Sequence, residues 1–235
     1  MLISAIQDQL ATGRLPERKH VIRHAVQYAP DQAAMPKAAN MLYSLGMARD
    51  RRALPVWQRV VDLLASVEAG DVCNQAKGTF YYVDAVCFGI ERLGGPSAVP
   101  ILRQLHSYAP FRHKELLSGF QADYLEERAA YLEVVIGRAL ARCGSPEGIV
   151  ILINYLNDVR GLLAEHAHDE LVAITGQDLS AAAWAEWLEI KGEGLKPAPW
   201  SALTDPMRAW GKTILTASAG DCNAEATNSG QELVQ

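Results

Sequence analysis

The densest group of potential metal ligands is the run Glu165-His166-Ala167-His168-Asp169-Glu170. Imidazole and carboxylate side chains bind zinc and iron. On a helix, His166 and His168 point about 200° apart, so one ion cannot take both from the same face. Glu165 and His168 are three residues apart and could share an ion, but two ligands make an incomplete site. We therefore expect a solvated polar face and no bound metal, with Glu165 and His168 as the weak metal candidates.

A second histidine pair, His20 and His24, has the four-residue spacing that can chelate a metal on a helix. Lys19 and Arg23 flank the pair and no acidic residue is near, which favours an ordinary surface pair. The sequence has no Gly-x-Ser-x-Gly elbow, no Walker loop and no Gly-x-Gly-x-x-Gly motif. We predict no catalytic residue and no cofactor, although a site assembled across distant segments stays open.

Composition narrows the classes of function. The 235 residues carry a net charge of −5, which argues against a nucleic-acid binder, because such proteins need a basic surface. The four cysteines have no CxxC spacing and indicate no disulfide framework. Cys87 and Cys143 lie in apolar runs where a thiol packs as a small hydrophobe. No signal peptide or membrane span is evident, so we expect a cytoplasmic protein without membrane contact.

The elements that would position these residues are helices. Apolar side chains recur at helical spacing, and almost no stretch alternates with a period of two, so we expect no sheet. Gly46 is expected to stop the helix that begins at Ala38, and 68–78 to be irregular. Residues 109–124 read as an inserted loop with a short helix at 114–117. The predicted helices cover 2–10, 16–30, 38–45, 53–64, 80–93, 98–108, 126–142, 147–157, 162–174, the segment of Trp184 and Trp187, and 205–215.

One helix–turn–helix junction occurs three times, within 93–105, 51–57 and 144–152. Aligning Ala53, Ala98 and Gly148, which are 45 and 50 residues apart, matches apolar positions through the following helix. It also matches Leu45, Ile90 and Leu140 at the end of the preceding helix. Neither helix of such a unit can bury its apolar face alone, and stacking of neighbours buries a continuous core. The alternative is an ordinary helical bundle.

At these residues the chain resembles the HEAT-repeat family, in particular the HEAT-like units of the phycobilisome lyase type. The family pattern is a helix end, a Gly/Asp/Pro turn, and Ala-Val-Pro-x-Leu opening the next helix. Residues 95–102, Gly-Pro-Ser-Ala-Val-Pro-Ile-Leu, fit this well, as do 52–57, whereas 148–152 lack the proline. The ending Ile-Thr-Gly-Gln-Asp at 174–178, followed by Trp184 and Trp187, is similar to the closing segment of some bacterial HEAT-repeat proteins.

The resemblance, over about residues 38 to 190, implies an all-α fold: an α-solenoid of stacked antiparallel helix pairs forming a right-handed superhelix. We expect N-terminal capping helices in 1–36, HEAT-like repeats in 37–191, a docking segment in 192–216 and a disordered tail in 217–235. HEAT-like deoxyhypusine hydroxylases bind two irons through paired His-Glu motifs on successive repeats. This chain departs from that pattern, because its only other histidine–acid neighbourhood is His113-Lys114-Glu115.

In such a solenoid the second helix of each unit normally lines the concave side, so its polar residues would form a groove. Trp57 and Tyr155 could add aromatic anchors, although the alignment of Trp57 with Leu102 and Leu152 favours a core position. The predicted groove residues are Gln58, Arg59, Asp62, Arg103, Gln104, His106, Asn154, Asn157 and Asp158.

We therefore expect a non-catalytic scaffold that binds a protein or peptide through a mixed-charge groove and binds neither nucleic acid nor a cofactor. HEAT-like repeats serve unrelated roles, so fold alone does not decide function. One alternative is a HEAT-like enzyme or accessory protein, either bilin lyase-like or resembling a metal-dependent hydroxylase, or the regulatory domain of a larger enzyme. Bound chromophore or metal would indicate the enzyme. A third alternative, DNA binding, would show a steep salt dependence.

Overall fold

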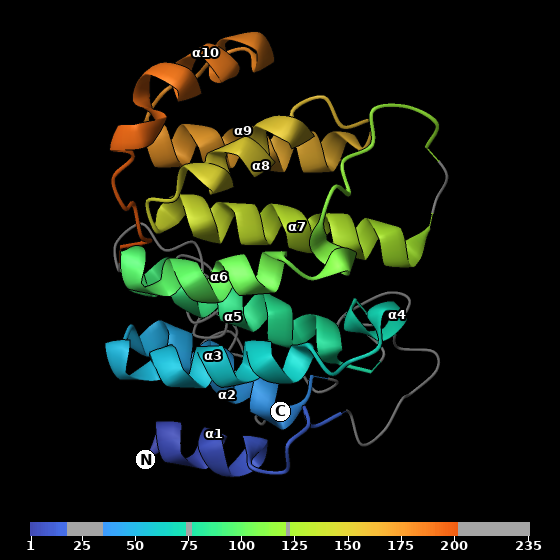
Figure 1. Cartoon of the computed structure of the whole chain (residues 1–235), viewed down its shortest axis with the longest axis vertical. Helices are drawn as coiled ribbons and strands as arrows, with labels where there is room; N and C mark the ends of the chain where they lie inside the picture. The colour runs from blue at the N-terminus through green and yellow to red at the C-terminus, as the bar shows by residue number, and fades with distance from the viewer. Residues whose placement is uncertain (18–34, 74–76, 121–122, 202–235) are drawn as a thin grey trace, which may run out of the picture. The chain divides into compact units, whose positions relative to one another are not determined.

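The computed structural model describes residues 1–17, 35–73, 77–120 and 123–201 (Figure 1). These residues form α-helices and short 3₁₀ turns, and contain no β-strand. The all-α prediction is therefore confirmed. In chain order the elements are α1 (Leu2–Leu10), α2 (Lys37–Ala48), η3 (Arg51–Ala53), α3 (Leu54–Leu64), α4 (Ala69–Val72), α5 (Thr79–Leu93), η4 (Pro96–Ala98), α6 (Val99–His106), η5 (Ala109–Phe111), α7 (Tyr124–Arg142), α8 (Pro146–Tyr155), α9 (Gly161–Thr175), α10 (Ala181–Lys191) and η6 (Gly192–Gly194).

The chain divides into two units, Met1–Pro199 and Trp200–Gln235, and all the helices named above belong to the first. Predictions for 205–215 and for the tail 217–235 lie outside the described residues, as does nearly all of the predicted helix 16–30. In the described parts of the chain, no helix has the length and apolar character that crossing a membrane requires.

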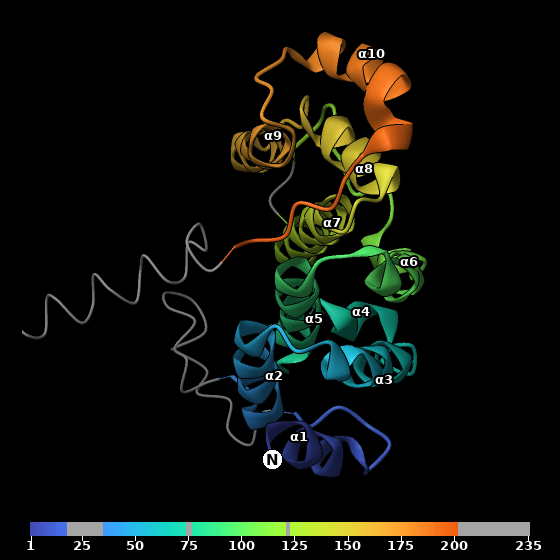
Figure 2. The same ribbon diagram turned by 90° about the vertical axis from the view of Figure 1, so that its left-hand side faces the viewer.

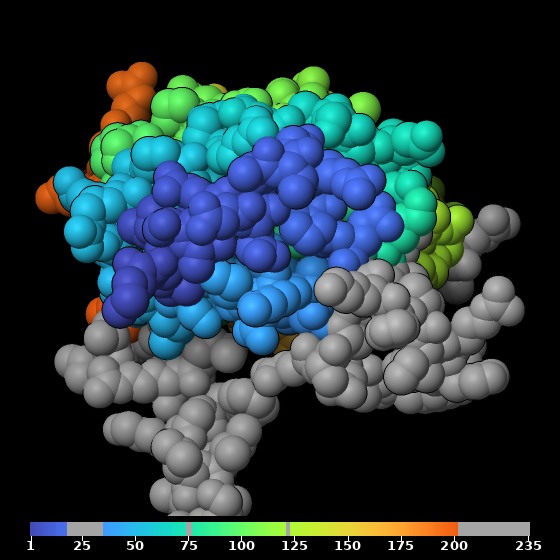
Figure 3. All heavy atoms as spheres, turned by 90° about the horizontal axis from the view of Figure 1, so that it is seen from below, coloured from blue at the N-terminus to red at the C-terminus, as the bar shows by residue number. Residues whose placement is uncertain are grey.

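Within the first unit the helices lie in two rows. Figure 2 shows α2, α5, α7 and α9 on one side and α3, α6, α8 and α10 on the other. Along the first row, α5 contacts both α2 and α7, and α7 contacts α9; the strongest contact between the rows joins α7 to α8. Figure 3 shows α1 and the residues after it spread over one end of the unit, where α1 contacts α2 and α3.

The three predicted junctions share one backbone feature. Arg49, Gly94 and Gly144 follow α2, α5 and α7, and all three have positive φ angles, of 53°, 62° and 85°. These are equivalent positions in the alignment, each four residues after the matched Leu45, Ile90 and Leu140. A left-handed residue ends a helix by turning the chain away from its axis. The sharp turns therefore follow from the sequence at these points.

Prolines then start the next helices. Pro55, Pro100 and Pro146 lie in the first turns of α3, α6 and α8, where no backbone N–H is needed. The helices α3 and α6 begin one residue after the aligned Ala53 and Ala98, whereas α8 begins two residues before the aligned Gly148. All three lie on the same side of the unit (Figure 2).

Three local predictions are wrong. Gly46 lies inside α2, which continues to Ala48; its Cα faces α5, and a Cβ there would lie 2.8 Å from the Cα of Gly89. It is small because two helices cross at that point. The short helix expected at 114–117 is absent, because the side chains of Glu133 on α7 and of Asp158 just after α8 bind the backbone N–H groups there. The segment 68–78, which was expected to be irregular, contains the short helix α4.

The core confirms the burial expected from the apolar pattern. Trp57 is buried and lies against Gly89, so it is a core residue and offers no exposed anchor. Tyr155 is also buried and its hydroxyl donates to Glu133. Cys87 and Cys143 are buried free thiols, as expected, and burial raises the pKa of Cys143 to about 12.

Candidate functional site

The histidine–acid run on α9 does not converge on one point. His166 faces α7, with Nε2 3.3 Å from Nη1 of Arg138. His168 lies 3.2 Å from the Oδ1 of Asp178. Glu165 is exposed. Among the residues that the structure describes, no group of three or more His, Cys, Asp or Glu side chains could hold a metal ion. His20 and His24 lie outside those residues.

Three of the predicted groove residues, Gln58, Asp62 and Gln104, form a hydrogen-bonded cluster where α3 meets α6. The Nε2 of Gln58 lies 2.6 Å from the Oε1 of Gln104 and 2.8 Å from the Oδ1 of Asp62. The Nε2 of Gln104 in turn donates to Asp62 and to the Tyr108 hydroxyl. These side chains satisfy one another, so their direct effect is to hold the two helices together.

The remaining groove residues on these helices stay at the surface. Arg59 is exposed on α3, and Asn154 and Asn157 are exposed on α8 and just beyond it. Arg103 on α6 is also exposed and pairs with Glu147 at 2.8 Å. A surface ion pair of this kind contributes about 0–1 kcal/mol. These four side chains are accessible to a partner, but they do not join the hydrogen-bonded cluster of Gln58, Asp62 and Gln104.

His106 and Asp158, the last two predicted groove residues, contact the side chains that anchor loop 112–120 or anchor it themselves. The Glu133 carboxylate on α7 accepts from His106, from the backbone N–H groups of His113 and Lys114, and from the Tyr155 hydroxyl, at 2.7–3.1 Å. Burial raises the pKa of Glu133, but these hydrogen bonds outweigh it, and the pKa lies below its ordinary value.

Asp158 holds the other side of the same loop. Its Oδ2 accepts from the backbone N–H of Leu116 at 2.8 Å, and both oxygens bind the guanidinium of Arg160. Arg160 also donates to the carbonyl of Lys114. The loop is thus fixed to α7 on one side and to the start of α9 on the other, which fixes the segment leading to Phe120.

Beside this loop lies a cavity of about 550 Å³ between α7 and α9, called here the α7–α9 pocket. It falls in the range of 300–1,000 Å³ that is usual for ligand sites. Its walls are mostly apolar and aromatic. The lining residues are Phe120, Tyr124, Glu127, Arg128, Tyr131, Val159, Arg160, Gly161, Leu162, Leu163 and His166.

Exposed apolar side chains gather around the pocket. Within the described residues, six of the ten large apolar side chains that are exposed lie in 117–125 and 159–162. Leu162 is 82% exposed and Phe120 is 52% exposed. Single exposed apolar residues are common on soluble proteins, whereas a cluster marks a binding surface. The six are Leu117, Phe120, Tyr124, Leu125, Val159 and Leu162.

The polar groups of the pocket lie on α7 and α9. The Arg138 guanidinium donates to Glu91 at 2.6 Å and approaches His166 Nε2 at 3.3 Å. Since a guanidinium only donates, His166 accepts and is neutral. Burial, and then the Arg138 charge, lower the pKa of His166. Burial raises the pKa of Tyr131 to about 12. Two polar groups of the lining, the phenol of Tyr131 and the imidazole of His166, are therefore uncharged.

This arrangement makes stability depend on pH. Because the pKa of His166 is lower in the folded chain than its unfolded value of about 6.5, the unfolded chain binds more protons below that pH. The contribution of His166 to the free energy of unfolding should be fully present above about pH 6.5 and should be lost as the pH falls below that value. His166→Gln, whose amide oxygen can accept from Arg138, should show a smaller fall in Tm between about pH 7 and pH 5. His168→Gln, at a half-buried position on the same helix, is the control, and an unchanged fall in H166Q would contradict the assignment.

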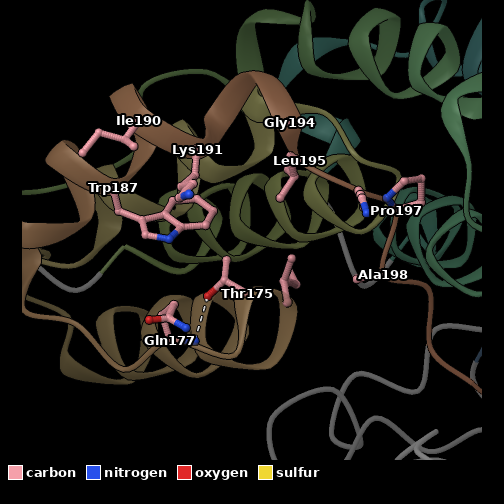
Figure 4. Close-up of a pocket in the computed structure, with 11 residues that line it drawn as sticks. Thr175, Gln177, Trp187, Ile190, Lys191, Gly194, Leu195, Pro197 and Ala198 are labelled. Carbon is pink, nitrogen blue, oxygen red and sulfur yellow. Dashed lines mark hydrogen bonds between the residues drawn. The ribbon is translucent and has the colours of Figure 1, made fainter.

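A second cavity, of about 700 Å³, lies between the end of α9, α10 and the segment after η6. Figure 4 shows Trp187, Ile190 and Lys191 on one wall and Thr175 and Gln177 opposite. The hydroxyl of Thr175 is already hydrogen-bonded within the protein: it donates to the carbonyl of Leu171 and accepts from the backbone N–H of Gln177. The charged side chains in the lining, Lys191 and Lys196, are both exposed, so this cavity offers no buried polar group to orient a ligand.

No known protein family, no curated protein and no solved structure matches this chain. The α7–α9 pocket was not predicted from the sequence. Its residues come from a loop, the start of α7 and the start of α9, and in sequence they resemble ordinary core positions of two helices. One available signal was the pair Leu162-Leu163 directly at a helix start with Phe120 in a polar loop.

Proposed function

We propose that this chain is a non-catalytic protein-interaction module, built as a right-handed α-solenoid of HEAT-like helix pairs. The left-handed exits at Arg49, Gly94 and Gly144 support the repeat, because they occupy equivalent alignment positions. The common side taken by α3, α6 and α8 supports stacking of the units (Figure 2). Such a module acts as a scaffold or as the regulatory domain of a larger protein.

The observation that carries the binding function is the exposed apolar surface at the α7–α9 pocket. Leaving Phe120, Tyr124 and Leu162 in water costs free energy, about 25 cal/mol for each Å² of apolar area. Covering them on binding recovers that free energy. Burial of large apolar and aromatic side chains is the main source of affinity in protein interfaces.

The predicted groove on α3, α6 and α8 is the second place where a partner could bind. Its clustered members, Gln58, Asp62 and Gln104, hydrogen-bond to one another and offer few donors or acceptors to a partner. Arg59 and Asn154 are exposed but polar, and rim contacts of this kind contribute little affinity. We therefore place the main binding surface at the α7–α9 pocket.

Affinity capture from the source cell tests this function and its location together. The bait is the purified full chain, compared with Leu162→Glu and with the double reversal Arg59→Glu/Arg103→Glu. We expect specific proteins on the wild-type chain, their loss on L162E, and their retention on the double reversal. Leu162 is 82% exposed, so its replacement leaves the fold intact, which circular dichroism verifies.

The outcomes separate the two surfaces. If the captured proteins are lost on Arg59→Glu/Arg103→Glu and retained on Leu162→Glu, the binding surface lies on the side of α3, α6 and α8. If the wild-type chain captures no protein beyond those that an unrelated helical bait also captures, the chain is not an interaction module.

A further inference from the structure

We propose that the α7–α9 pocket binds an amphipathic helical segment of a partner protein, with a large apolar side chain in the pocket and a carboxylate beside Arg128. This rests on the proposed function and adds the chemistry of the partner.

The apolar part of the partner follows from the walls of the pocket. Phe120 and Tyr124 come from the loop and the start of α7, Val159 and Leu162 from the turn before α9 and its first residues, and all four are exposed. Tyr131 and neutral His166, which also line the pocket, carry no charge that would disfavour an apolar group. A cavity of about 550 Å³ accepts a leucine or aromatic side chain together with its neighbours on the same helix face.

The length of the partner follows from the apolar surface beyond the pocket. Leu117 and Leu125 are 67% and 40% exposed in the same segment, yet neither lines the cavity. A small molecule that filled the pocket would leave both in water. A helix that presents apolar residues three and four positions apart can cover the pocket and its surroundings at once.

The carboxylate follows from charge. The Arg128 guanidinium lies 5.1 Å from the ring centre of Tyr124 and 5.5 Å from that of Phe80, and no carboxylate in the described residues pairs with it. The other cation of the lining, Arg160, is bound by Asp158 and also feels the charge of Glu127. Arg128 is therefore the cation left to meet an acidic group.

The start of α9 favours a negative charge in the same place. Its N-cap is Arg160, whose side chain cannot accept a hydrogen bond, and no side chain caps this helix. The N-terminal end of a helix carries a partial positive charge. Gly161 and Leu162, the first residues of α9, line the pocket, so a carboxylate at its edge would interact with both Arg128 and the helix end.

The pocket is held in shape before any partner arrives. Glu133 and Asp158 fix loop 112–120, and the backbone N–H of Val159 donates to the carbonyl of Leu116 at 2.8 Å. A preformed surface loses less conformational entropy on binding. This favours recognition of a short segment over a large interface.

Peptide selection on the intact chain tests the proposal. The probe is a phage-displayed library of random linear peptides, selected on the wild-type chain, and the affinities of enriched peptides are measured by fluorescence anisotropy. We expect aromatic or leucine residues at helical spacing beside Asp or Glu. Affinity should fall at least about tenfold on Leu162→Glu and on Arg128→Glu. Ile190→Glu, a matched change at an exposed aliphatic residue lining the other cavity, should bind as wild type.

A charge exchange makes the test specific. Replacing the acidic residue of a selected peptide by lysine should weaken its binding to the wild-type chain and restore binding to R128E. Selected peptides that bind wild type and L162E equally would overturn the inference and leave the interaction function standing. A library that yields no peptide above background would count against both. Self-association of the chain that L162E abolishes would show a second copy as the occupant and overturn the partner proposed here.

Discussion

Replacing Gly148 by alanine should destabilise the chain by about 3 kcal/mol or more, which for a chain of this size lowers Tm by about 6 to 12 °C. An added Cβ at Gly148 would overlap the backbone nitrogen of Ala141 and the backbone oxygen of Gly137. These are main-chain atoms of α7, so no side chain can rotate away, and α7 and α8 must separate. Thermal unfolding followed by circular dichroism measures the effect.

The control is Gly70→Ala in the short helix α4, where an added Cβ meets nothing within 4 Å. Alanine favours the helical backbone, so this variant should be unchanged or more stable by about 0.4–1 kcal/mol. If G148A unfolds at the same temperature as G70A, the close approach of α7 to α8 is not a feature of the protein.

Replacing Glu133 by alanine should cost about 3–5 kcal/mol, because it removes a buried carboxylate that accepts four hydrogen bonds. The N–H groups of His113 and Lys114 and the hydroxyl of Tyr155 would lose their acceptor. We expect a fall in the free energy of unfolding, measured by urea titration, and faster proteolytic cleavage within loop 112–120.

Glu126→Gln is the matched control, since Glu126 is a glutamate on the same helix whose side chain is 61% exposed and pairs only with Lys114 among the described residues. It should change stability by less than about 1 kcal/mol. The stabilising effect of Glu133 should also diminish in acid, because its pKa is lowered on folding and the contribution is lost as the pH falls through that lowered value. An E133A variant that loses no more stability than E126Q would show that the loop is not anchored in this way.

The helices and their junctions could be predicted from the sequence because their causes are local. Pro55 and Pro100 begin helices since a first turn needs no N–H from them, and Gly94 and Gly144 end helices since glycine tolerates a positive φ. Such rules depend on neighbours in the chain and not on distant contacts.

Long-range contacts explain what could not be predicted. Glycine often ends a helix, which is why Gly46 was expected to do so. Instead Gly46 allows α2 to approach α5 at Gly89, forty-three residues later. In the sequence Asp158 looks like any solvent-exposed aspartate, but in the structure it accepts a hydrogen bond from the backbone N–H of Leu116. Backbone groups carry no sequence signature, so a carboxylate that accepts from them cannot be told from a solvated one.

The candidate site illustrates the same limit. The predicted groove was assembled from polar residues at matching positions of three units, and polar character alone cannot separate Gln58, which bonds within the protein, from exposed Asn154. The α7–α9 pocket combines residues forty positions apart, Phe120 with Arg160, that only the anchored loop brings together.

Hydrogen–deuterium exchange on the intact chain, with and without a captured partner or selected peptide, tests most directly whether the chain binds proteins through the α7–α9 pocket. We predict slower exchange in the presence of the partner at the backbone amides of 124–131 and 161–166, with α3 and α6 unchanged. Slower exchange confined to α3, α6 and α8, with 124–131 and 161–166 unaffected, would contradict the account.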